Sequence, residues 1–127
     1  MQIKRFPNTI IFQKVDELVR ILGGYWPPLS ALARLTEEIG ELTTELQRNK
    51  FLNHLTEPIA NEIADVYFIT ITLAHNYCVE VPDDAVEVEK EVESFQIQDI
   101  IFNIYVIAGE IARNINGYEG PKAFRTN

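Results

Sequence analysis

Apolar residues recur along most of the chain at the spacing of an α-helix. One stripe alternates intervals of three and four residues and consists of Leu32, Leu35, Ile39, Leu42 and Leu46. A second stripe has the same intervals and consists of Ile97, Ile100, Ile104, Ile107 and Ile111. Side chains at these intervals lie on one face of a helix and are typical of the seam of a helical bundle.

The pattern and its end signals together predict five helices. They cover about residues 8–22, 28–49, 56–77, 83–93 and 95–116. Gly23-Gly24 and Asn116-Gly117 are expected to end the first and last of these helices, and Thr56 to cap the third. The third helix is apolar nearly all round, which predicts a central place in the fold or in an oligomer. We therefore predict an all-α fold, a bundle of about five helices in a single domain over 1–127, completed by oligomerisation.

Composition and charge exclude several classes of function. The 127 residues are 46% hydrophobic and 24% charged, as in an ordinary globular domain. The formal net charge of −8 argues against binding to a nucleic-acid polymer or to an anionic membrane. Cys78 is the single cysteine and cannot form an internal disulfide, and no apolar run has the length of a signal peptide or a membrane span. We expect a cytoplasmic protein.

Two short acidic motifs interrupt the apolar helices. They are EEIGE at 37–41 and EIAD at 62–65, and in each motif two acids lie three residues apart, on one helix face. Four carboxylates that converge in a helical core would repel one another unless a cation lies among them. All-oxygen ligands favour a hard cation such as Mg²⁺, with Mn²⁺ as the alternative. The candidate ligands are Glu38, Glu41, Glu62 and Asp65.

The acids differ in the strength of their claim. Asp65 lies between Ala64 and Val66 in the most apolar part of the chain, so a solvated surface position explains it poorly. Glu37 has the weakest claim and would lie behind the ligands or on the surface. Glu45 continues the face of Glu41 by one turn, and we expect it to be solvated. The first motif alone would indicate a solvated helix face, and the second motif is what favours a metal site.

The segments around both motifs resemble the MazG-like nucleotide pyrophosphohydrolases of the all-α NTP pyrophosphatase superfamily. Residues 24–42 (GYWPPLSALARLTEEIGEL) are similar to the first motif block of that family and 61–66 (NEIADV) to the second. The resemblance implies metal binding and catalysis by the last two glutamates of the first motif and both acids of the second. It also implies hydrolysis of an NTP or dNTP to the monophosphate and pyrophosphate, by a homodimer or homotetramer.

Other residues are candidates for contact with the substrate. Trp26 has a ring that can stack on a base, although packing against the helix turn explains it equally well. Arg34, Lys122 and Arg125 are candidates for phosphate contact, and each alone also fits an exposed surface role. The tail at 118–122 resembles the tails of some MazG-like proteins.

Three other functions stay open at this point. One is an enzyme of the phosphoribosyl-ATP pyrophosphatase type, from the same superfamily. A second is a non-catalytic helical interaction module, against which the presence of all four acids argues. A third is a di-iron carboxylate bundle, but neither His54 nor His75 follows a glutamate by three residues. The sequence has no P-loop, HExxH or paired CxxC motif, which argues against a P-loop nucleotidase or a zinc site.

Overall fold

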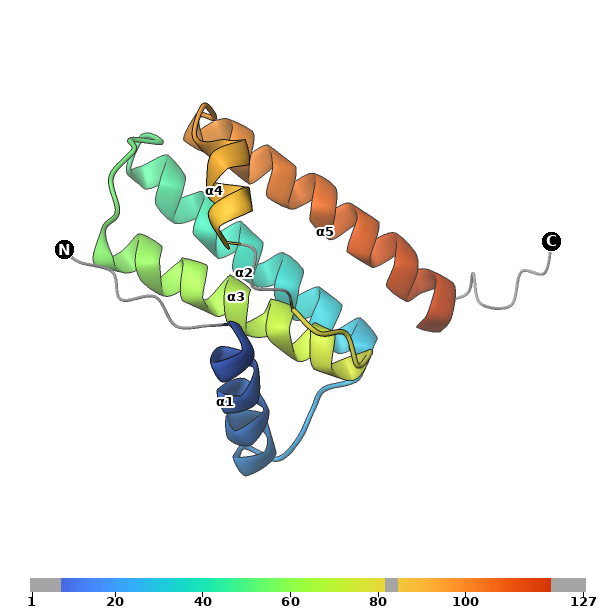
Figure 1. The fold of residues 1–127 in the computed structure, drawn as a ribbon. Helices are drawn as coiled ribbons and strands as arrows, with labels where there is room; N and C mark the ends of the chain where they lie inside the picture. Colours follow the sequence, from blue (N-terminus) through green and yellow to red (C-terminus); the bar gives the residue numbers. More distant parts are fainter. Residues whose placement is uncertain (1–7, 82–84, 120–127) are drawn as a thin grey trace.

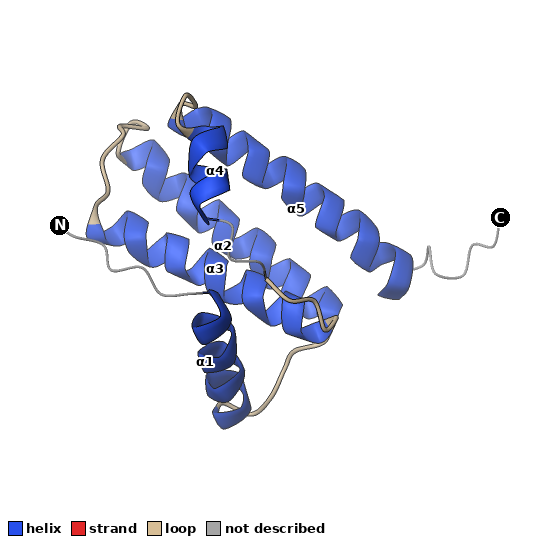
Figure 2. Ribbon diagram, in the orientation of Figure 1, coloured by secondary structure: helices blue, strands red, loops and turns tan. Residues whose placement is uncertain are grey.

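The computed structural model describes residues 8–81 and 85–119, and these form five α-helices and no strand (Figures 1 and 2). The helices are α1 (Asn8–Ile21), α2 (Pro28–Arg48), α3 (Glu57–Asn76), α4 (Ala85–Val92) and α5 (Ile97–Glu119). The predicted all-α class is therefore confirmed, and four of the five helices end within about one residue of the predicted position.

Local chemistry explains where the helices begin and end. The side chain of Thr56 accepts a hydrogen bond from the backbone N–H of Ile59 at 3.4 Å, so the predicted cap of α3 is present. After α1, Gly23 and Gly24 adopt φ values of 114° and 101°, in the left-handed region that favours glycine. These two glycines turn the chain toward Pro28, which opens α2.

The predicted end of α5 at Asn116-Gly117 is wrong, because the helix continues to Glu119. Contacts with the end of α3 hold this extra turn. The hydroxyl of Tyr77 donates to the carboxylate of Glu119 at 3.4 Å, and the rings of Tyr77 and Tyr118 lie 6.1 Å apart. Tertiary contacts have thus outweighed the local tendency of glycine to end a helix.

The antiparallel helices α2 and α3 form the centre of the fold (Figure 1). α5 packs on α2, and α1 packs across α3. The largest core cluster joins α2, α3 and α5 and consists of Ala31, Leu35, Ile39, Ile69, Leu73 and Ile115. A second cluster joins the other ends of these helices, and a third fastens α1 to α3 through Val15, Val19 and Ile71. The core therefore fixes α2 and α3, which carry the acidic motifs, as one rigid pair.

Among the five helices described, none combines the length and the apolar composition that a membrane crossing requires.

Candidate metal centre

Three acids from α2 and α3 meet on one side of the central helix pair. Glu38, Glu41 and Glu62 each contribute a carboxylate oxygen, and these three oxygens lie within 4.8 Å of one another. The antiparallel packing of α2 and α3 sets the two motifs side by side. Oxygens this close to one another are suitable ligands for one shared divalent cation.

Glu38 is the most buried acid of this cluster, with 1% of its surface exposed. Its Oε1 forms an ion pair with Nη2 of Arg34 at 2.7 Å, whereas its buried Oε2 has no hydrogen-bond partner among the described residues. Burial raises the pKa of Glu38. The Arg34 charge opposes this rise in pKa, and the charges of Glu41, Asp65 and Glu62 add to it.

Glu62 has a similar environment on α3. Its Oε2 is also buried and lacks a hydrogen-bond partner within the described part of the chain. Burial raises the pKa of Glu62, and so do the neighbouring charges of Glu41 and Asp65. An unpaired buried carboxylate oxygen is costly, and two of them in one acid cluster are what a bound cation would satisfy. The residues present therefore fit a divalent metal.

Asp65 is not one of the three acids whose oxygens meet. Its side chain and that of Ala64 are exposed, so the expectation that Asp65 is shielded from solvent is wrong. The apolar neighbours of Asp65 in sequence point to other faces of α3, which a helix allows because successive residues are 100° apart. Asp65 follows Glu62 by three residues on α3, and its charge contributes to the raised pKa of both Glu38 and Glu62. A ligand role for Asp65 stays a prediction.

Two further glutamates on α2 flank the cluster. Glu37 is exposed and accepts a hydrogen bond from Nη1 of Arg34 at 3.0 Å, so Arg34 bridges Glu37 and Glu38. Glu45 is half-buried, pairs with Arg48 at 2.6 Å and contributes to the raised pKa of Glu62. The expectation of a merely solvated Glu45 missed this proximity to Glu62. The sequence feature that could have predicted this proximity is the position of Glu45 seven residues after Glu38, on the same helix face.

The predicted substrate contacts lie beside the cluster or outside the described residues. Trp26 is 53% exposed, and the guanidinium carbon of Arg34 lies 6.0 Å from the centre of its ring. Both residues line a shallow groove that also includes Glu37. This groove adjoins the acid cluster because Arg34 contacts Glu38. Lys122 and Arg125 lie outside the described residues.

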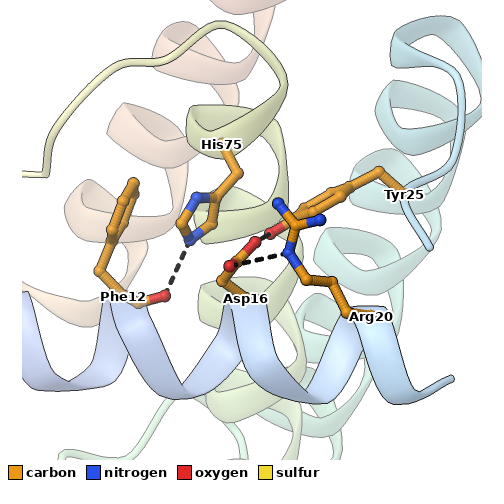
Figure 3. A network of polar contacts seen from close by, with 5 residues as sticks. All are labelled: Phe12, Asp16, Arg20, Tyr25 and His75. Atoms are coloured by element: carbon orange, nitrogen blue, oxygen red, sulfur yellow. Dashed lines mark hydrogen bonds and ion pairs between the residues drawn. The ribbon is translucent and has the colours of Figure 1, made fainter.

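A polar network fixes α1 and the following loop against α3 (Figure 3). The carboxylate of Asp16 accepts hydrogen bonds from the Tyr25 hydroxyl at 2.6 Å and from Nε of Arg20 at 3.0 Å. Nε2 of His75 lies 2.8 Å from the backbone carbonyl of Phe12, and since a carbonyl only accepts, Nε2 donates. Burial and Asp16 raise the pKa of Tyr25. The network anchors Tyr25 and thereby sets the position of the neighbouring Trp26.

The sequence and the fold are similar to those of known proteins. No protein-family profile matches the sequence. The YpjD protein of Bacillus subtilis is 36% identical over a match that covers 47% of this chain and 62% of that protein's length. The crystal structure of the Bacillus-conserved MazG protein, a nucleotide pyrophosphohydrolase, has a TM-score of 0.55 and 27% identity, over 76% of this chain and 97% of its own.

The crystal structure of YpjD from Bacillus subtilis is also similar, with a TM-score of 0.50 and 30% identity. The match covers 73% of this chain and 95% of the YpjD chain. Both solved relatives are covered over nearly their whole length, so the likeness extends across their folds and is not confined to the acidic motifs.

Proposed function

Because this chain belongs to the MazG-like family of nucleotide pyrophosphohydrolases, we propose that it hydrolyses a nucleoside triphosphate to the monophosphate and pyrophosphate with the help of Mg²⁺. The observation that carries this proposal is the cluster of Glu38, Glu41 and Glu62 with its two unpaired buried carboxylate oxygens. We include Asp65 as a fourth ligand and treat 1–127 as one catalytic domain.

The four acids would act by holding metal at a fixed place on two rigid helices. When bound there, a divalent ion supplies positive charge for the phosphate oxygens and lowers the pKa of a coordinated water. The acids themselves are too negative to accept a triphosphate, since each repels the phosphate oxygens. This explains why the proposed reaction depends on metal.

The side chains around the cluster suggest how the nucleotide lies. Trp26 would support the base, and Arg34 would contact the phosphates. The α-phosphate would then lie nearest the acids, and Lys122 and Arg125 stay candidates for contact with the β- and γ-phosphates. Water attacks the α-phosphorus, the bond from that phosphorus to the bridging oxygen breaks, and pyrophosphate leaves as one unit.

Hydrolysis in ¹⁸O-labelled water tests the reaction and the bond that is cleaved. We expect pyrophosphate as the second product, no orthophosphate, and the label on the monophosphate. Replacing Glu41 by Gln should lower kcat by at least about a hundredfold, because a metal ligand is lost, whereas Glu37→Gln should retain most activity. Release of a nucleoside diphosphate and orthophosphate would contradict the proposal, and so would full activity of Glu41→Gln. Including phosphoribosyl-ATP among the substrates separates the NTP reaction from its closest alternative.

We further propose that the active protein is a homodimer or homotetramer. Its support is an exposed apolar face on α5 that includes Phe102, Tyr105, Val106 and Ile107. Patches of this kind on a small protein are typical of protein–protein contact.

A further inference from the structure

Among the ion pairs in the described part of the chain, only one involves an acid of the cluster of Glu38, Glu41 and Glu62. It joins Nη2 of Arg34 to Oε1 of Glu38 at 2.7 Å. Only 2% of the Glu38 side chain is exposed, so water has little access to replace this contact. The pair is therefore part of the candidate metal centre and differs from the exposed pairs that contribute little.

The guanidinium group of Arg34 is held by contacts with three side chains. Glu37 and Glu38 follow Arg34 by three and four residues and so lie beside it on the helix surface. Nη1 of Arg34 donates to Oε1 of Glu37 at 3.0 Å. Its central carbon lies 6.0 Å from the centre of the Trp26 ring, within the range of a cation–π contact. A long side chain restrained in this way can in turn fix the carboxylate that it contacts.

The two carboxylate oxygens of Glu38 have different surroundings. Oε1 is paired with Arg34, whereas Oε2 is buried and has no hydrogen-bond partner among the described residues. A carboxylate held at one oxygen has little freedom to rotate, so its other oxygen keeps its direction. We propose that Arg34 is a positioning residue for the metal, which holds Oε1 of Glu38 and leaves Oε2 for the ion. The proposal rests on the proposed function, because it assumes a divalent ion among these acids.

The charge of Arg34 acts on metal affinity in the opposite direction. A positive charge repels a nearby cation, so charge alone would make Arg34 weaken metal binding. A group that orients a metal ligand strengthens binding, and its loss typically lowers metal affinity by about 10- to 100-fold. The Glu37 carboxylate contacts the same guanidinium and offsets its charge, which favours the orienting effect. Arg34 has five N–H donors, so these contacts still leave donors for the substrate phosphates.

Calorimetric titration with Mn²⁺, without nucleotide, tests the proposal. Arg34→Gln should weaken Mn²⁺ binding by at least about tenfold, because Glu38 loses its anchor. Arg34→Lys keeps the charge but not the planar fork, and it should weaken binding by a smaller factor. Arg20→Lys is the matched control, since Arg20 also pairs with an acid four residues away, Asp16 at 3.0 Å, but outside the cluster. This change should leave the affinity unaltered, and melts in EDTA check that each variant folds.

A double-mutant cycle separates positioning from a general effect on structure. In a Glu38→Gln background, Arg34→Gln should cause no further loss of Mn²⁺ affinity, because Arg34 acts through Glu38. A further tenfold loss there would overturn the proposal. Wild-type affinity in Arg34→Lys would overturn it as well, since charge would then suffice.

Equal or tighter Mn²⁺ binding by Arg34→Gln would mean that repulsion outweighs orientation, which also contradicts the proposal. In that case the metal centre and the pyrophosphohydrolase proposal still stand. If the wild type binds no Mn²⁺, the metal centre fails and the role of Arg34 fails with it. If the wild type binds Mn²⁺ but hydrolyses no nucleotide, the proposed function fails, and the affinities of the Arg34 variants still decide the role of this residue.

Discussion

At the scale of single residues, the free-energy cost of clustering the acids is concentrated at Glu62. Without metal it has an unpaired buried oxygen and charged neighbours of the same sign. We predict that Glu62→Gln, which keeps the shape and removes the charge, stabilises the metal-free protein by about 1 kcal/mol, or a few degrees in Tm. Millimolar Mg²⁺ should raise the Tm of the wild type by linkage and have little effect on the variant.

Thermal melts in EDTA and in Mg²⁺ measure both effects. Glu110→Gln serves as the control, since Glu110 is an exposed glutamate on α5, and this change should alter neither melt. Identical melts of the wild type in EDTA and in Mg²⁺ would contradict a metal site in this cluster.

Asp16 is the second residue whose charge has a measurable consequence. Hydrogen bonds from Tyr25 and Arg20 lower its pKa in the folded protein, whereas in the unfolded chain it titrates near its ordinary value of about 3.9. A carboxylate with a lowered pKa stabilises the fold above its unfolded pKa, and this stability is lost as the pH falls through the folded pKa. We predict that Asp16→Asn is less stable than the wild type at pH 7 and that the difference shrinks below pH 4.

Urea denaturation at pH 7 and pH 3 checks this prediction. Glu17→Gln is the matched control, because Glu17 forms only a loose exposed pair with Lys14 at 3.9 Å, and exposed pairs contribute little. A difference between Asp16→Asn and wild type that is the same at both pH values would show that the carboxylate charge is not what stabilises the network.

At the scale of helices, the sequence predicted most of the fold because its signals were local. Periodicity defined the buried face of α2, and Thr56 and Gly23 marked two helix ends. On α5 the predicted stripe was wrong in part, because Ile107 is 55% exposed and the buried residues are Ile101 and Ile115. The end of α5 was missed because contacts of Tyr77 with the last turn are tertiary. Helical spacing put the acids of each motif on one face, but spacing alone does not reveal which residues face solvent. This is why the exposure of Asp65 could not be predicted.

A pocket lined by Trp26, Phe68 and Asn76, among others, illustrates the same limit. Its walls come from the loop after α1 and from the second half of α3, which are more than forty residues apart in sequence. The hydrogen bond from Asn76 to the Trp26 carbonyl joins them, and no local sequence pattern predicts such a contact. A site of this kind becomes visible only when the helices are placed in space.

At the scale of the whole molecule, the outer face of α5 is the feature still without a described partner. Phe102 and Val106 are 64% and 60% exposed, and they lie one turn apart on a helix whose main contact is with α2. A second copy of the chain would bury this face, so light scattering should give a mass of two or four times 14.6 kDa. Val106→Glu adds a charge there and should shift the protein toward the monomer, because burial of an unpaired charge is costly.

The control for this change is Gln13→Glu, which adds the same charge at an exposed position on α1 and should leave the mass unaltered. A wild-type mass of 14.6 kDa at micromolar concentration would rule out the oligomer. If Val106→Glu stays oligomeric, the interface must instead lie on another face of the molecule. Activity of the two variants then shows whether assembly matters for the site. The acids lie on α2 and α3, so a monomer that still binds Mg²⁺ but no longer turns over substrate would mean that the partner copy completes the substrate site.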